Sequence, residues 1–424
     1  MRYKVGIAIG GSIGGLTAAI RLREMYEIVY CISGFDEYKE ASNNGKTRGL
    51  RTVNLEEELE EMVLEGWKYW RDIGVRGDII SGEITHKFHE EVEYMFSKNH
   101  KELLRILDDM SPCKTFRSSA QIDEYTVVEG TGIYKIKEIV KNLKKIAKNC
   151  GVIMVKGHVN GIMVNKKSAN VEYYDESMIE RSIICDRCIM CIGNSSKYVE
   201  TNMRYKKPIS VWNEFSYYKL LKRRNNQKGY WTWGSVDYNT GEIYKNRLGF
   251  YVMLEEEDVL KVASDTSFIK KGIEWGNMVD YRKQKDEFVR KEMKLEYSDI
   301  KYDECYYAIA PFVQTEGNVS VIHGGGYGYC VAGMVLRAIS GGYIPENKHY
   351  EMQKREIERH DLALYDITSI HKPIPKDECK FGSNCTRCNL HKYDINYQDH
   401  CDCSCQKDHN IEHIEQEQMI QSKL

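Results

Sequence analysis

The chain has 424 residues, which is enough for two domains and an appendage. Its formal net charge is −2, so the composition gives no steering toward nucleic acid or an anionic membrane. No apolar run approaches the roughly 18 residues of a membrane-spanning helix, and no signal peptide is visible. We therefore expect a protein that is not secreted and has neither nucleic acid nor membrane among its partners.

The first predicted element is a strand, a glycine-rich turn and a helix over residues 4–23. The turn matches G-x-G-x-x-G through Gly10, Ser12 and Gly15. Gly10 allows the sharp turn, Ser12 stands where close backbone approach to a pyrophosphate favours glycine, and Gly15 lets the helix pack on the strand. Free N–H groups at the helix start then predict a bound dinucleotide phosphate, although a turn that binds nothing is the alternative. The cofactor-binding candidates of this turn are Gly10, Gly11, Ser12, Ile13, Gly14 and Gly15.

A second strand is predicted over residues 27–33. In dinucleotide-binding units an acidic residue at the end of this strand usually binds the ribose hydroxyls. Ser33 occupies that place here. Serine can still form a hydrogen bond with a hydroxyl group, so Ser33 is a further cofactor-binding candidate.

The segment that follows reads Asn44-Gly45-Lys46-Thr47-Arg48-Gly49-Leu50-Arg51. It resembles the H-G-D-T-R-x-x-R segment found after the second strand in the sarcosine oxidase branch of the D-amino-acid oxidase superfamily of flavoenzymes. A helix is predicted next, because apolar residues recur at a spacing of three to four. This apolar stripe comprises Leu55, Leu59, Met62, Val63, Trp67 and Trp70.

The resemblance recurs downstream in the order of the family and spans roughly residues 4–345. The matching segments are a helix over 132–149, a strand and turn over 188–193, Arg247–Phe250 for K-L-G-Y, Cys305–Tyr307 for C-M-Y, and Val319–Tyr329 for the last strand and G-H-G-F loop. Other strands are expected at 230–234 and 247–253, and a charged helix at 281–293.

The implied fold class is α/β, with a discontinuous Rossmann-like FAD-binding domain, an antiparallel-sheet substrate domain and a Cys-rich C-terminal tail. The FAD-binding domain is predicted to comprise residues 1–84, 132–205 and 305–350. The substrate domain is predicted to comprise residues 85–131 and 206–304, and the tail residues 351–424.

The resemblance also implies roles for single residues. Arg48 would lie near the flavin ring, and Arg51 would bind a substrate carboxylate; two surface arginines are the alternative. Cys305 would bond the flavin covalently, with an ordinary thiol as the alternative. The other implied cofactor contacts are Asn44, Gly45, Thr47, Gly193, Gly325, Gly326, Tyr327 and Gly328.

Three positions depart from the family pattern. Arg247 replaces a lysine linked to oxygen activation, and Tyr251 replaces a histidine; both stay catalytic candidates together with Arg51. Cys330 replaces the lysine that shares the substrate carboxylate with the arginine, so one of two carboxylate cations is missing there. Candidates to line the substrate pocket are Tyr251, Tyr306, Tyr307, Tyr327 and Tyr329.

The sequence thus predicts an FAD-dependent oxidoreductase that oxidises the C–N bond of a small amino acid or N-alkyl amino acid to an imine, with O2 as acceptor. An aromatic hydroxylase using NAD(P)H is an alternative, although Ile192-Gly193 and His323-Gly324 depart from its Asp-Gly and Gly-Asp pairs. A non-catalytic flavoprotein with a metal-binding tail is another.

The tail holds thiols and imidazoles at the spacing of zinc ligands. Its metal candidates are Cys379, Cys385, Cys388, His391, Cys401, Cys403 and Cys405, with incidental thiols as the alternative. The chain ends in Ser422-Lys423-Leu424, an address read by the peroxisomal import receptor. We expect a peroxisomal location if the source is eukaryotic and a cytoplasmic one otherwise.

Overall fold

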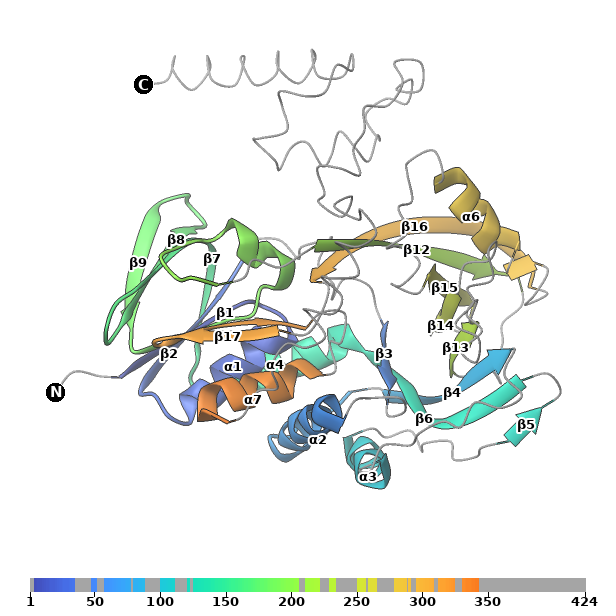
Figure 1. The fold of residues 1–424 in the computed structure, drawn as a ribbon, viewed down its shortest axis with the longest axis horizontal. Coiled ribbons are helices and arrows are strands. Elements are labelled where there is room, and N and C mark those ends of the chain that lie inside the picture. The colour runs from blue at the N-terminus through green and yellow to red at the C-terminus, as the bar shows by residue number, and fades with distance from the viewer. Residues whose placement is uncertain are drawn as a thin grey trace, which may run out of the picture.

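The computed structural model describes residues 4–34, 47–51, 57–77, 79–87, 100–110, 120–122, 125–205, 210–221, 229–233, 250–256, 258–264, 278–287, 289–290, 295–308, 312–324 and 330–342. Within these ranges the chain forms two β-sheets that lie in separate lobes (Figure 1). Strand β3 (Thr47–Arg51) and helix α2 (Glu57–Asp72) lie between the lobes.

The first sheet has a parallel centre. Its strand order is β17-β18-β10-β1-β2-β7-β8-β9, and the pairs from β18 to β7 are parallel. The antiparallel strands β17, β8 and β9 extend it at its two ends. The bounds are β17 Phe312–Glu316, β18 Val319–His323, β10 Arg187–Met190, β1 Val5–Ile9, β2 Ile28–Ser33, β7 Ile153–Val164, β8 Ala169–Asp175, β9 Glu180–Cys185, and β11 Glu200–Thr201, which pairs with β7.

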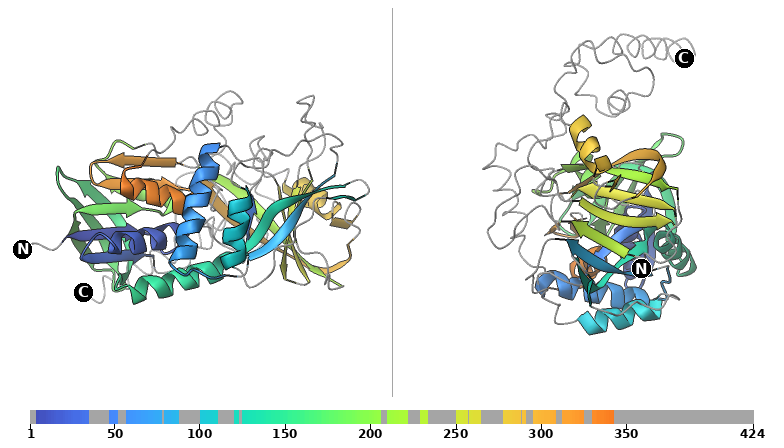
Figure 2. Two further views of the ribbon diagram at one scale, coloured as in Figure 1. Left: turned by 90° about the horizontal axis from the view of Figure 1, so that it is seen from below. Right: turned by 90° about the vertical axis from the view of Figure 1, so that its right-hand side faces the viewer.

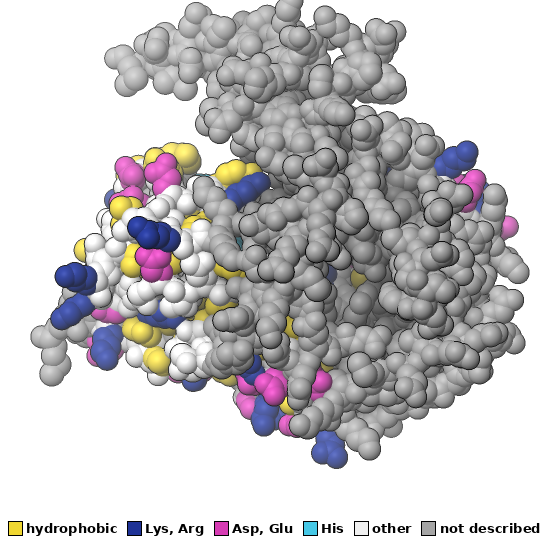
Figure 3. All heavy atoms as spheres, in the orientation of Figure 1, with side chains coloured by type: hydrophobic (Ala, Val, Ile, Leu, Met, Phe, Trp, Pro, Cys, Tyr) yellow, Lys and Arg dark blue, Asp and Glu magenta, His cyan; other side chains and the backbone are white. Residues whose placement is uncertain are grey.

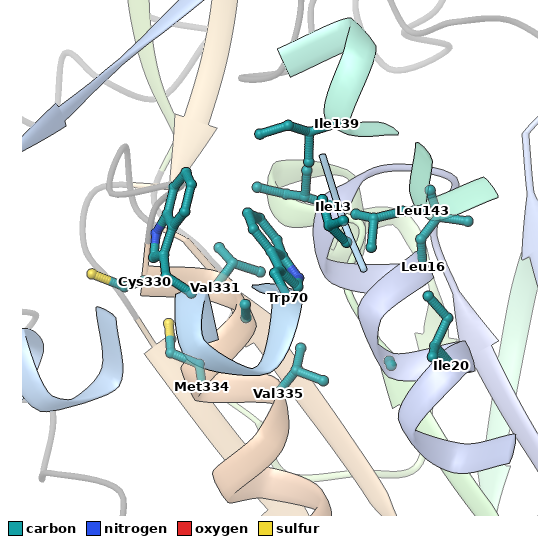
Figure 4. Packing of buried hydrophobic residues seen from close by; sticks show 14 of the residues in the cluster. Ile13, Leu16, Ile20, Trp70, Ile139, Leu143, Cys330, Val331, Met334 and Val335 are labelled. Atoms are coloured by element: carbon teal, nitrogen blue, oxygen red, sulfur yellow. The ribbon is translucent and has the colours of Figure 1, made fainter. Parts of the chain in front are cut away.

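Helices cover one face of the first sheet. They are α1 (Ile13–Arg23), α4 (Ile136–Asn149) and α7 (Val331–Ser340). In Figure 4, Trp70 of α2 lies between labelled side chains of α7 and those of α1, and its indole nitrogen donates a hydrogen bond of 2.9 Å to Thr17 Oγ1. Because this contact satisfies the buried indole N–H, the tryptophan can fill the core without an unpaired donor.

The other face of the first sheet is covered by its own extension. Ile7 and Ile9 of β1 pack with apolar residues of β7 and β8, whereas Ala8 between them faces the helices. This alternation follows the two-residue period of a strand. The outer surface of the extension carries exposed Met178, Ile179 and Ile184, interspersed with charges of both signs (Figure 3).

The second sheet is mostly antiparallel. Its order is β16-β12-β15-β14-β13-β4-β6-β3, with β5 paired to β6 and one parallel pair, β13 with β4. The bounds are β16 Tyr297–Ala308, β12 Ser210–Leu220, β15 Val259–Ser264, β14 Phe250–Glu256, β13 Gly229–Trp233, β4 Ile79–Lys87, β6 Tyr125–Lys135 and β5 Ala120–Ile122. Helix α6 (Met278–Glu287) lies beside β12 and β16, and α3 (His100–Met110) beside α2 (Figure 2).

An aromatic cluster joins the second sheet to the helices of the first. Tyr134, at the end of β6, packs edge-on against Trp67 of α2 at 5.5 Å, and Trp67 packs against Trp70 at 5.1 Å. All three side chains are buried. Since Tyr134 pairs with Arg48 in the sheet register, the cluster also fixes strand β3 against the helices.

Helices α2 and α7 cross at two glycines. A Cβ on Gly333 would lie 1.9 Å from the Met62 carbonyl oxygen, and one on Gly66 would lie 2.6 Å from the Gly333 amide nitrogen. The two backbones are therefore in direct contact. This close approach places the predicted apolar stripe in the core: Leu59, Met62, Val63, Trp67 and Trp70 are buried, and Leu55 lies outside the described residues.

We expect Gly333→Ala to destabilise the protein by about 3 kcal/mol, because the methyl group must push two backbones apart. The control is Gly342→Ala, at a position where a Cβ meets its nearest atoms at 3.5 Å. Urea unfolding of both variants measures the difference. Equal stability of the two variants would contradict the helix crossing.

The predicted fold class is confirmed, with local differences. Residues 132–135 end strand β6, so α4 begins only at Ile136, and the charged helix begins at Met278 rather than at 281. Strand β3 was not predicted, and it places Arg48 and Arg51 in the second sheet.

Among the described residues, no helix has both the length and the apolar composition needed to cross a membrane.

Candidate functional site

The glycine-rich turn lies between β1 and α1. Gly10 has φ +128°, its amide donates a 2.8 Å hydrogen bond to the Ile32 carbonyl, and a Cβ there would lie 2.7 Å from the Cys191 carbonyl oxygen. The turn is thus closed between the ends of β2 and β10. Only glycine fits, for reasons of both conformation and space.

Three further glycines keep this turn compact. A Cβ on Gly15 would lie 2.0 Å from the Gly10 carbonyl oxygen, one on Gly14 would lie 2.7 Å from Val331, and one on Gly11 would lie 2.8 Å from Ser33 Cβ. The turn is therefore packed against α7 and the end of β2. These contacts place Ser33 directly beside the turn, where the sequence predicted a ribose contact.

The first turn of α1 has the electrostatics of an anion site. Ser12 occupies the N-cap position, and the first helical hydrogen bond runs from the Leu16 amide to the Ser12 carbonyl at 2.9 Å. The amides of residues 13–15 precede this bond, and no acidic residue lies in the first turn. Partial positive charge at this end favours a phosphate.

Strand β3 brings a second group of candidates to the junction of the lobes. Thr47 is fully buried, and its Oγ1 has no hydrogen-bond partner among the described residues. Arg48 is half-buried, donates from Nη1 to the Thr47 carbonyl at 2.6 Å and lies 5.9 Å from the Phe215 ring. Strand β3 thus carries a buried hydroxyl and a half-buried guanidinium on consecutive residues, and each is a group that can bind an anionic or polar ligand.

The end of β10 forms the third part. Gly193 follows this strand with φ +57° and begins the short helix η1 (Gly193–Tyr198). His323, at the end of the adjacent β18, is buried, stacks on Phe312 at 5.7 Å and lies 3.4 Å from Ser196 Oγ. Burial lowers the pKa of His323 to about 4, and the Gly193 backbone partly opposes this shift.

The folded protein keeps His323 neutral, whereas the unfolded chain takes up a proton below pH 6.5. The free energy of unfolding should therefore decrease as the pH is lowered. The loss begins near pH 6.5 and is complete near pH 4, and it amounts to about 3 kcal/mol. We expect His323→Asn to remove this part of the pH dependence. Urea unfolding at several pH values measures it, with the exposed His158→Asn as control; an unchanged pH profile in His323→Asn would refute the assignment.

Cys330 does not lie among these polar groups. Its side chain is fully buried in the apolar cluster at the start of α7 (Figure 4), and burial raises the pKa of its thiol. A neutral thiol in the core cannot bind a carboxylate in place of a lysine. A second cation for the substrate carboxylate would have to be the side chain of another residue.

Several predicted residues are placed only by their backbone. Arg51 pairs with Thr131, Tyr251 lies in β14 opposite Ala263, and Cys305 lies in β16 opposite Asn213. Others lie outside the described residues: Asn44, Gly45, Arg247, Gly325, Gly326, Tyr327, Gly328, and the tail candidates Cys379, Cys385, Cys388, His391, Cys401, Cys403 and Cys405. In the described part of the chain, no three His, Cys, Asp or Glu side chains form a metal-binding group.

The second sheet contains two buried ion pairs that were not predicted. Glu214 of β12 contacts Lys285 Nζ at 2.8 Å and Arg282 Nε at 2.9 Å. Burial lowers the pKa of Lys285 to about 8, and Glu214 partly opposes this shift. The second pair joins Glu255 and Lys261 at 3.8 Å. The signal for the second pair was Lys261 itself, a single charge within the apolar run 259–263.

Comparison with known proteins supports the fold. No family model matches the chain, and no curated protein matches its sequence. Solved structures do: NikD, an unusual amino acid oxidase essential for nikkomycin biosynthesis, has a TM-score of 0.54 at 13% identity, covering 84% of this chain and 96% of that one. L-proline dehydrogenase from P. horikoshii has a TM-score of 0.55 at 13% identity, covering 84% and 98%. Iminodiacetate oxidase from Chelativorans sp. has a TM-score of 0.50 at 13% identity, covering 82% and 98%.

At this level of identity the likeness establishes the fold alone. The resemblance to the D-amino-acid oxidase superfamily is therefore confirmed for the architecture, and the sarcosine oxidase branch stays a prediction. The matches extend over nearly the whole length of the neighbours. Both lobes of this chain thus belong to the shared fold.

Proposed function

We propose that the protein is an FAD-dependent oxidoreductase that oxidises the C–N bond of a small amino acid or N-alkyl amino acid to an imine. The observation that carries this proposal is the glycine turn, where four glycines are packed too closely to accept a side chain. It lies in a fold shared with amino acid oxidases, an amine oxidoreductase and a proline dehydrogenase. We further propose O2 as the acceptor.

The residues present fit FAD. The diphosphate would face the amides that precede the first hydrogen bond of α1, and Ser33 would contact the ribose. The Thr47 hydroxyl, which has no hydrogen-bond partner in the described part of the chain, would gain one from the bound cofactor. FAD supplies the redox chemistry of the reaction, and the protein supplies orientation and charge.

Two arginines would bind the substrate and supply positive charge beside the flavin. Arg51 would hold the substrate carboxylate through its planar fork of donors, which fixes the C–N bond in one orientation. Arg48 would supply positive charge beside the flavin, held in place by the Thr47 carbonyl and the Phe215 ring. Arg247, Tyr251 and a covalent bond through Cys305 remain part of the proposal.

FAD binding and substrate oxidation can be tested in sequence. The purified chain is reconstituted with FAD, and bound flavin is measured by its visible spectrum after gel filtration. Anaerobic bleaching of that spectrum is then recorded against a panel of amino acids and secondary amines. Failure to bind FAD would defeat the proposal; bound flavin reduced only by NAD(P)H would replace it with the hydroxylase alternative.

Three further proposals, on the covalent flavin bond, on zinc in the tail and on peroxisomal import, have tests of their own. Acid precipitation separates free from covalently bound flavin, and Cys305→Ala should release any bound flavin into the supernatant. Metal analysis of the full chain tests zinc in the tail, and deletion of Ser422–Leu424 in a eukaryotic cell tests peroxisomal import. Zinc-free protein, or unchanged location after the deletion, would refute the respective proposal.

A further inference from the structure

The second sheet carries a connected series of charged and aromatic side chains that starts at Arg48. The Arg48 guanidinium carbon lies 5.9 Å from the centre of the Phe215 ring, and Lys261 Nζ lies 3.9 Å from the same centre. Lys261 Nζ then lies 3.8 Å from Glu255 Oε1. The series therefore links the junction of the lobes to the interior of the second sheet.

The last two members are almost completely withdrawn from water. The side chains of Glu255 and Lys261 are each 1% exposed, and Phe215 is buried as well. Charges in such surroundings are screened much less than surface charges, so their fields extend further. A charge at this place therefore acts on groups it does not touch.

The negative charge of Glu255 is compensated by only a long contact among the described residues. Neither of its oxygens has a hydrogen-bond partner among the described residues, and its contact with Lys261 is longer than a hydrogen bond. A buried carboxylate without hydrogen bonds is costly, so its retention needs a reason beyond stability. Lys261 in turn lies over the face of Phe215, where a cation is favoured.

We propose that Glu255 and Lys261 tune the midpoint potential of the bound flavin through the Arg48 end of the sheet, with opposite signs. The inference rests on the proposed function. Positive charge near the ring favours reduced flavin, so Lys261 raises the potential. Glu255 opposes the charge of Lys261 and lowers the midpoint potential.

The test uses three variants of the full chain loaded with FAD: Glu255→Gln, Lys261→Met and the double variant, which lacks both charges and serves as reference. The readouts are the midpoint potential and the affinity for sulfite, whose binding puts negative charge on the flavin. A unit charge that acts on an anion over roughly 10 Å, at an effective dielectric of about 20, changes the binding constant of that anion by more than about tenfold. FAD content and thermal unfolding are recorded in parallel.

Each single variant is compared with the double variant at the same pH, over a series of pH values. Relative to the double variant, we expect Glu255→Gln to bind sulfite about tenfold more tightly and Lys261→Met about tenfold more weakly. The exposed neighbour gives a control, Glu256→Gln, expected within about twofold of the unmodified protein.

Opposite shifts would support the proposal, because loss of packing alone would move both variants in one direction. Shifts of the same sign, or none relative to the double variant, would overturn it while leaving FAD binding intact. Failure of the unmodified chain to bind FAD would instead defeat the proposed function and this inference with it. The two failures are therefore distinguishable.

Discussion

Replacing Gly15 with alanine is expected to abolish FAD binding and to lower the unfolding temperature by several degrees. The new Cβ would lie 2.0 Å from the Gly10 carbonyl oxygen and 2.6 Å from its carbon, and both are backbone atoms. Relief requires α1 to move away from β1, at a cost of about 3 kcal/mol. That movement carries the amides of residues 13–15 away from the position at which they would bind the FAD diphosphate.

A graded series separates this effect from a general loss of stability. In Gly11→Ala the clash is 2.8 Å with Ser33 Cβ, a side-chain atom, so we expect weaker binding with a smaller loss of stability. Gly342→Ala should bind FAD like the unmodified protein. Flavin fluorescence titration and thermal unfolding measure the series. Normal FAD affinity in Gly15→Ala would show that this turn does not hold the diphosphate.

Glu214→Gln is expected to destabilise the protein by about 3–5 kcal/mol. The substitution removes the carboxylate charge that the buried Lys285 and Arg282 both contact. Arg282 is partly exposed and can turn toward water, whereas Lys285 cannot. The effect should therefore arise mainly from Lys285.

Combining Glu214→Leu with Lys285→Met should recover most of the lost stability, because apolar side chains of similar volume replace a buried pair at little cost. Glu180→Gln, on the exposed edge of β9, serves as control. Urea unfolding measures all three. If Glu214→Gln were as stable as the control, the pair would not contribute to holding α6 on β12.

Short-range patterns predicted the elements that form locally. The alternation in β1, the glycine spacing and the apolar stripe of α2 all lie within single segments, and each appears where expected. Strand β3 could not be predicted in this way. Its sequence Thr-Arg-Gly-Leu-Arg has no strict alternation, and it becomes a strand because β6 offers it a partner.

The site was predictable where its parts are contiguous, and the remainder depends on distant contacts. Ser33 and the glycine turn come together because β1 and β2 are neighbours in both sequence and space. Glu214 and Lys285 are 71 residues apart, and no local pattern announces their pairing. Likewise, only the structure shows that Cys330 is buried at the start of α7.

The order of the elements has a consequence for how a protein of this fold can change. The chain enters the second sheet through β3, β4, β5 and β6, returns to the first through α4 and β7, and re-enters the second at β12. Neither lobe is one continuous stretch. The lobe of the second sheet therefore cannot be exchanged by a single recombination event, and changes in it have to arise by point replacement or by lengthening of individual turns.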